Sequence, residues 1–212
     1  MGQHKLSPMR KVLLTAFLIA LPLTAQNDVA DAPENVHPLL VGATVPDLEL
    51  TTLEGETVHL MDIVRQRPTV LIYYRGGWCP FCNRQLSQLQ GLEPMLKEAG
   101  YQIVAISPDR PSKLRKSLDK RDLSYILLSD STMTGARRFG LAWKVADRQV
   151  ASYKRKFMDI AAASGQEHHL LPVPGVFILD RKGMIHFQYV NPNHRVRLSA
   201  ELLKAAALAA LK

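Results

Sequence analysis

Cysteine is scarce in this chain: its 212 residues contain only two, Cys79 and Cys82. A second Cys-x-x-Cys pair is absent, which argues against a structural zinc site with four thiolate ligands. No apolar run is as long as a transmembrane helix requires. Internal repeats and low-complexity segments are also absent. The formal net charge is +8, but few aromatic side chains lie among the clustered lysines and arginines. The charge therefore does not by itself favour a nucleic-acid-binding protein.

The two cysteines lie in the segment Trp78-Cys79-Pro80-Phe81-Cys82. The continuous β-favouring run Thr69–Tyr74 before it predicts a buried central strand, which Gly76-Gly77 ends. After Cys82, leucines recur at three- and four-residue spacing, as on the buried face of a helix that Gly100 ends. These leucines are Leu86, Leu89, Leu92 and Leu96.

Residues three apart in a helix share one face, so Cys79 and Cys82 can close a small disulfide ring. Cys79 would lie at the helix N-terminus, where unpaired amides and the helix dipole favour a thiolate. We therefore predict Cys79 as the nucleophile and Cys82 as the resolving thiol, with Trp78 shielding both from water. Two alternatives are a structural disulfide, which would close too short a loop to stabilise much, and a metal clip using His168 and His169.

The N-terminus has the three-part layout of a secretory signal: basic residues, the apolar run Val12–Leu23, then Thr24-Ala25. We expect a signal peptide over residues 1–25, a flexible linker over 26–38 and one domain over 39–212. An uncleaved anchor is the alternative to cleavage. Export would place the protein in the periplasm or outside the cell, without stable membrane insertion after cleavage, and in an oxidising compartment.

Positive charge gathers in short clusters, which solvated helix faces would explain. Docking of an acidic protein or of anionic lipid is the alternative. The clusters are Lys113 to Arg121, Lys154 to Lys156, and Arg195 with Arg197.

The order of predicted elements indicates an α/β fold with a mixed sheet, because parallel crossovers come early and an antiparallel hairpin comes late. Residues 145–165 have no clear pattern and are interpreted as a partly helical insertion. The Cys-x-x-Cys pair follows a parallel strand, where reactive groups belong. The predicted strands are 42–50 and 56–60 (an N-terminal hairpin), 69–74, 101–107, 124–128, 175–179 and 184–190; further helices are 111–121, 131–139 and 198–211.

This order, with Trp-Cys-x-x-Cys after the first central strand, resembles the thioredoxin fold: a central mixed β-sheet flanked by helices, here with an N-terminal β-hairpin extension. The resemblance implies that Pro174 forms a cis peptide bond beside the cysteines and that Val173 offers backbone groups to an extended peptide. The buried acid of thioredoxins corresponds to Tyr73, so the inner thiol must exchange its proton with another group or with water.

Three segments resemble the alkyl hydroperoxide reductase/thiol-specific antioxidant (AhpC/TSA) family, in its peroxiredoxin-like branch with a Cys-x-x-Cys pair. They are residues 74–82, Ala105–Asp109 and Phe177–Gly183. In that branch Cys82 falls on the peroxidatic position. Arg75 replaces a motif proline, and the peroxide-polarising arginine falls near Pro174, so Arg75 is a candidate substitute.

The resemblance implies a peroxiredoxin-like thiol-disulfide oxidoreductase with antioxidant activity, no cofactor, and an external electron donor. Its partner would be a protein thiol or disulfide. A first alternative is a thiol peroxidase in which Cys82 attacks a hydroperoxide. A second, of another class, is a periplasmic copper chaperone that uses Cys79, Cys82 and His169, since soft thiolates suit Cu(I).

Overall fold

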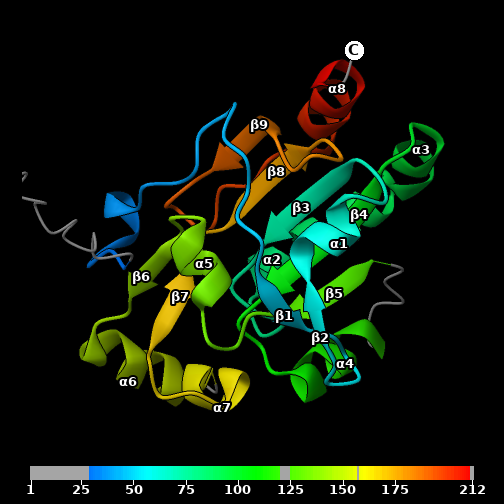
Figure 1. Cartoon of the computed structure of the whole chain (residues 1–212). Helices are drawn as coiled ribbons and strands as arrows, with labels where there is room; N and C mark the ends of the chain where they lie inside the picture. Colours follow the sequence, from blue (N-terminus) through cyan, green and yellow to red (C-terminus); the bar gives the residue numbers. More distant parts are fainter. Residues whose placement is uncertain (1–28, 120–124, 157, 211–212) are drawn as a thin grey trace, which may run out of the picture.

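A mixed seven-stranded sheet forms the centre of the protein, in the order β2-β1-β5-β4-β3-β8-β9 (Figure 1). The structure is a computed structural model that describes residues 29–119, 125–156 and 158–210. Strand β4 is parallel to β3 and β5, whereas β1 and β8 run antiparallel to both of their neighbours, so the predicted mixed sheet is confirmed. The strands are β1 (Glu49–Thr51), β2 (Thr57–His59), β3 (Thr69–Tyr73), β4 (Gln102–Ser107), β5 (Ile126–Ser129), β8 (Gly175–Leu179) and β9 (Ile185–Val190).

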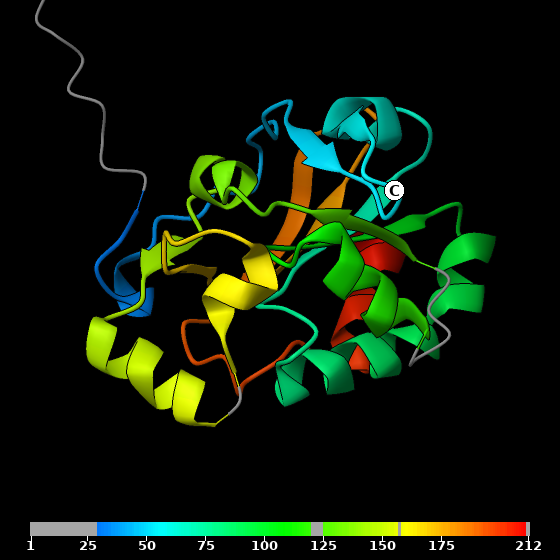
Figure 2. The same ribbon diagram turned by 90° about the horizontal axis from the view of Figure 1, so that it is seen from below.

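Helices cover both faces of this sheet, as the view from below shows (Figure 2). One face carries α1 (Leu60–Val64) and α5 (Thr134–Arg138); the other carries α2 (Pro80–Gln90), α4 (Pro111–Asp119) and α8 (Ala200–Ala210). Alternate residues of β3 point to opposite faces of the sheet, because side chains alternate along a strand. Leu71 and Tyr73 pack in one apolar cluster, and Val70 and Ile72 pack in the other together with both cysteines.

The leucine-rich segment after the cysteines forms two helices, whereas its spacing predicted one. The first, α2, ends at Gln90, and α3 (Glu93–Glu98) follows after Gly91 and Leu92. Pro94 explains the break, because a proline inside a helix removes a backbone hydrogen bond and clashes with the preceding turn. Pro94 is instead tolerated in the first turn of α3.

Two short strands outside the predicted elements form a separate antiparallel ribbon, β6 (Ala142–Lys144) with β7 (Leu170–Pro172). The insertion between them is helical, as expected in part, and contains α6 (Asp147–Arg155) and α7 (Ile160–Ser164). In Figures 1 and 2, these helices lie beside the ribbon at one end of the molecule.

The described part of the segment predicted as a flexible linker is packed against this ribbon. The backbone N–H of Ala30 donates to Ala142, and the Ala30 carbonyl accepts from Lys144. A short 3-10 turn, η1 (Pro33–Asn35), follows, and Val36 packs against the cluster around Trp143. Backbone pairing and apolar burial hold this segment, which its polar composition did not predict. The predicted signal peptide and residues 26–28 lie outside the described residues.

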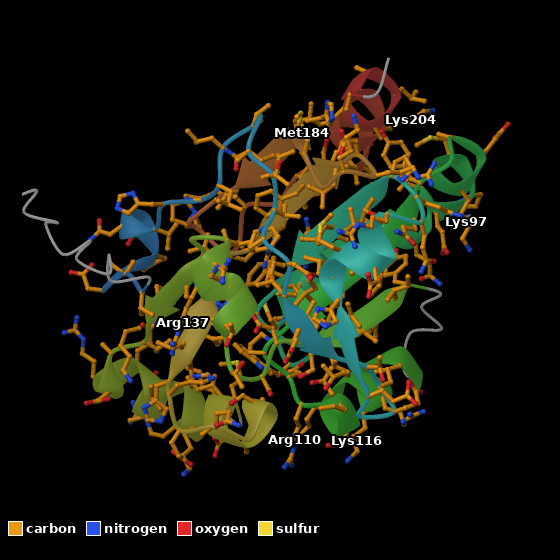
Figure 3. All side chains as sticks on the ribbon, in the orientation of Figure 1. Lys97, Arg110, Lys116, Arg137, Met184 and Lys204 are labelled. Atoms are coloured by element: carbon orange, nitrogen blue, oxygen red, sulfur yellow. The ribbon has the colours of Figure 1, made fainter. Side chains whose placement is uncertain are left out.

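Basic side chains are distributed over the outer surface. Figure 3 labels five of them, and all five are exposed: Lys97, Arg110, Lys116, Arg137 and Lys204. Among the described residues, no helix has both the length and the apolar character needed to cross a membrane.

Candidate active site

Cys79 caps the N-terminus of α2, and Cys82 lies one turn inside it. Cys79 has extended backbone angles (φ −86°, ψ 114°), and Pro80 starts the helix. The Asn83 N–H donates to the Cys79 carbonyl at 3.0 Å, which closes the first turn. Both cysteines are free thiols and both are buried, with exposed fractions of 1% and 0%. The predicted placement of the pair on one helical turn is therefore confirmed.

The pKa values of the two thiols are displaced in opposite directions. A side-chain hydrogen bond from Cys82 is the largest cause that lowers the pKa of Cys79 to about 6, and the positive charges of Arg75 and Arg197 add to it. Burial, together with the same hydrogen bond and the Cys79 charge, raises the pKa of Cys82 well above its ordinary value. At neutral pH this arrangement favours a thiolate at Cys79 and a neutral thiol at Cys82.

Arg75 is buried beside the pair, between two aromatic rings. Its guanidinium carbon lies 5.1 Å from the Trp78 ring centroid and 5.4 Å from that of Tyr153. Its Nη2 atom donates a 2.7 Å hydrogen bond to the Tyr153 hydroxyl. Such stacking holds a cation in place with a modest favourable energy. Trp78, predicted as a shield, also packs against the apolar cluster that contains both cysteines.

A second arginine reaches the pair from the loop between β9 and α8. Nη2 of Arg197 donates to the Cys82 sulfur at 3.3 Å. His194, on the same loop, meets the Phe81 ring edge-on at 5.6 Å. Burial lowers the pKa of His194 to about 4, and the nearby charges of Arg75 and Arg197 contribute. This imidazole is therefore neutral at pH 7.

A buried carboxyl, Asp109, lies at the other side of the Cys-x-x-Cys loop. Its Oδ2 atom accepts a 2.6 Å hydrogen bond from the Gly77 N–H. Burial raises the pKa of Asp109 to about 6, and the Cys79 charge contributes. Asp109 is thus a titratable group close enough to interact electrostatically with Cys79. Tyr73 occupies the strand position at which thioredoxins have their buried acid.

Sequence reasoning missed four of these residues as parts of the site: Asp109, Tyr153, His194 and Arg197. Asp109 belongs to one of the segments that resemble the family, and its position before Pro111 indicates a helix cap and no contact with the thiols. Arg197 was predicted only as part of a cluster of positive charge. Tyr153 lies in the insertion, which has no clear pattern. No local sequence signal separated them from ordinary surface residues, because long-range packing brings them to the cysteines.

Pro174 lies near the site, but the peptide bond before it is not cis as predicted. It lines a cavity of about 60 Å³ together with Arg75, Tyr153 and His194. All peptide bonds among the described residues are trans, so the cis prediction is wrong. The N–H of the preceding Val173 donates to the Leu141 carbonyl at 2.8 Å. Because this ribbon already uses that donor, it is not free for an extended peptide.

The histidines proposed for copper binding have other partners. His168 Nε2 lies 2.9 Å from the Ser131 carbonyl, and its Nδ1 accepts from the Leu170 N–H at 2.9 Å. His169 Nε2 lies 3.8 Å from a Glu167 carboxylate oxygen. Within the described ranges, no cluster of three or more His, Cys, Asp or Glu residues is arranged to hold a metal ion. The copper alternative therefore lacks its third ligand there.

Known proteins share extended similarity with this chain. The profile of the AhpC/TSA family matches residues 41–188. The chain belongs to the AhpC/TSA family. It is 36% identical over 107 residues to Peroxiredoxin Bcp of Escherichia coli strain K12, covering 50% of this chain and 67% of that protein. It is also 26% identical over 178 residues to Thiol-disulfide oxidoreductase ResA of Geobacillus kaustophilus, covering 84% and 83%.

The fold comparison confirms the thioredoxin-like architecture of this AhpC/TSA protein. The structure of Peroxidoxin BcpB from Mycobacterium tuberculosis superposes with a TM-score of 0.63 at 22% identity, over 81% of this chain and 98% of that one. The predictions of an oxidoreductase and of a peroxiredoxin-like thiol oxidoreductase function are confirmed by these relatives. They imply a thiol or peroxide substrate and a reductant.

Proposed function

We propose that this AhpC/TSA protein exchanges thiols and disulfides through a Cys79/Cys82 couple. Cys79 attacks the substrate disulfide and forms a mixed disulfide, and Cys82 then displaces the substrate thiol. The observation that carries this assignment is the hydrogen bond from the Cys82 thiol, which lowers the pKa of Cys79 to about 6. A thiol with a pKa near ambient pH is a good attacking group, since it is largely ionised and still nucleophilic.

Trapping of the mixed disulfide tests this order of attack. Cys82→Ser should accumulate a stable adduct with a disulfide substrate, because no second thiol can release it. Cys79→Ser should accumulate little, since the remaining thiol lies one turn inside the helix and burial raises its pKa. Mass spectrometry of the intact variants after brief exposure to oxidised glutathione measures both adducts. An adduct that forms faster on Cys79→Ser than on Cys82→Ser would reverse the assignment.

Peroxide reduction is the second candidate, and two observations favour it. The relative Bcp is named a peroxiredoxin, and Arg197 donates to the Cys82 sulfur, the residue on the peroxidatic position. Cys82 would attack the peroxide and become a sulfenic acid, which Cys79 would convert to the disulfide with release of water. Fast consumption of hydrogen peroxide by Cys79→Ser, with one equivalent consumed per protein, would establish this function.

The substrate must reach a buried pair. The cavity that Arg75, Tyr153 and His194 line has a volume of about 60 Å³, and neither cysteine is among its lining residues. A protein thiol or disulfide would have to displace the covering side chains. The midpoint potential of the Cys79/Cys82 couple would identify the direction of electron flow. A strongly reducing value implies a reductase that needs an external electron donor, and a high value implies an oxidant.

Export completes the proposal. The basic residues and apolar run before Ala25 support a cleavable signal peptide and a periplasmic or secreted protein. Expression of the full chain followed by N-terminal sequencing would test it. A mature N-terminus at Gln26 supports cleavage, and an intact N-terminus in the membrane fraction supports the anchor instead.

A further inference from the structure

Arg197 has an unusual environment for a partly buried arginine. Nη2 donates to the Cys82 sulfur at 3.3 Å. Nε and Nη1 are buried and have no hydrogen-bond partner within the described part of the chain. None of the ion pairs found among the described residues involves this guanidinium. Within the described part of the chain, this guanidinium thus donates to a sulfur atom and forms no ion pair with a carboxylate.

Burying a cation without an anion costs free energy, and ionisation of the adjacent thiol would offset that cost. The side chains of the other charged or titratable groups around the pair have other partners, although the Arg75 backbone also hydrogen-bonds to Cys82. Arg75 donates to Tyr153. His194 is neutral at pH 7. Asp109 accepts from Gly77. Among these groups, Arg197 is the cation whose side chain contacts Cys82.

We infer that Arg197 is a catalytic residue of the resolving step, in which it stabilises Cys82 as the thiolate that attacks the mixed disulfide. This inference rests on the proposed function. In the first step the Cys79 thiolate forms a bond to one sulfur of a disulfide RSSR and releases RS⁻. In the second step the Cys82 thiolate attacks the Cys79 sulfur, the bond to the remaining RS breaks, and the second RS⁻ leaves. The two leaving thiolates take up the protons that the cysteines lost. The substrate disulfide is reduced by two electrons and the dithiol is oxidised.

The arrangement also orders the two steps. While Cys79 is a thiolate, it receives the hydrogen bond of the Cys82 thiol and keeps Cys82 protonated. Once Cys79 is bound in a mixed disulfide, its negative charge is gone and that hydrogen bond loses its charged acceptor. Two interactions that favour the Cys82 thiolate then remain: the Arg197 side-chain contact and a hydrogen bond with the Arg75 backbone. Loss of the Cys79 charge therefore removes part of what raises the pKa of Cys82, while burial still raises it and Arg197 still lowers it.

The reaction with 4,4′-dithiodipyridine separates the steps, because each releases one absorbing thione. Arg197→Met should slow the second release roughly tenfold, the change that one pKa unit produces, and leave the first release within about twofold. Arg197→Lys keeps the charge and should recover most of the second rate. Arg195→Met is the matched control, since Arg195 is exposed, lies two residues away and changes net charge equally. Equal slowing by Arg195→Met, or no slowing by Arg197→Met, would overturn the inference.

A titration that needs no turnover gives a second measurement. In the Cys79→Ser background, thiolate absorbance at 240 nm reports Cys82 alone. Adding Arg197→Met should raise the pKa of Cys82 by about one unit, and adding Arg195→Met should leave it nearly unchanged. If Cys82→Ser traps no mixed disulfide, the proposed function fails. If it traps one but the two arginine variants titrate alike, only the role of Arg197 fails.

Discussion

The Tyr153 hydroxyl accepts a 2.7 Å hydrogen bond from the Arg75 guanidinium, and the Tyr153 ring stacks on the same group at 5.4 Å. This contact joins α6, in the insertion, to the loop between β3 and α2. Gln149 also donates to the hydroxyl, at 2.8 Å. The insertion therefore forms part of the wall of the dithiol site, and changes in it should alter thiol chemistry.

Loss of the Tyr153 hydroxyl should weaken the electrostatic support of Cys79. Tyr153→Phe keeps the ring but removes the acceptor for Arg75, so the guanidinium gains freedom to turn away from the thiol. We expect the pKa of Cys79 to rise, with alkylation at pH 6 slower by roughly twofold. Iodoacetamide labelling followed by mass spectrometry measures the rate. Tyr101→Phe is the control, because it loses a hydroxyl bonded to Ala207 at 2.8 Å and should not change the labelling. Equal rates in wild type and Tyr153→Phe would contradict the role of this contact.

The alkylation rate of the reduced protein should follow the pKa of Cys79, which is about 6. Because the folded protein lowers this pKa, the thiolate is present above pH 6 and is lost as pH falls below it. The rate should therefore reach a plateau above about pH 7 and fall roughly tenfold per unit well below pH 6. A rate that still rises between pH 8 and pH 9 would indicate an ordinary thiol.

Removal of the Asp109 charge should lower the pKa of Cys79, whereas removal of a nearby cation should raise it. A carboxylate near Cys79 disfavours the thiolate, so Asp109→Asn should lower the pKa of Cys79 and increase labelling at pH 5.5–6 by roughly twofold. The asparagine oxygen can still accept from the Gly77 N–H, which preserves the loop. Asp62→Asn, an exposed carboxylate on α1, serves as the control. A pKa of Cys79 that rises in Asp109→Asn would show that its structural role dominates.

Gly76 should tolerate no side chain. Its φ of +139° is strained for other residues, and an added Cβ would lie 2.7 Å from Asp109 Oδ1 and overlap the Trp78 indole nitrogen. We expect Gly76→Ala to cost about 3 kcal/mol of unfolding free energy and to disturb Trp78 fluorescence. Gly91→Ala is the matched comparison, because Gly91 has helical angles and its nearest new contact is 3.4 Å away. It should change stability by less than about 1 kcal/mol. Urea denaturation gives both values, and equal losses would contradict the argument.

Strong local patterns made much of the fold predictable. The apolar run at Thr69 predicted β3, and the segment before Asp180 predicted β8, because buried central strands are continuous apolar stretches. The elements that were missed or misjudged depend on a single residue or on distant partners. Pro94 divided a helix whose apolar spacing continued through it. The β6–β7 ribbon consists of three-residue strands that are stable only through pairing with each other and with Ala30.

The residues alone predict the local arrangement of the thiols: two cysteines three residues apart, a strand before them and a helix after them. Helical geometry fixes that relationship within a few residues of chain, so no distant contact was needed to predict it. The charges that surround the thiols depend on how distant segments fold together. Arg197 and Tyr153 lie 115 and 78 residues from the groups they bond, Cys82 and Arg75. Electrostatic interactions depend on distance in space, and the folding of β9, its following loop and α6 around the helix N-terminus sets those distances.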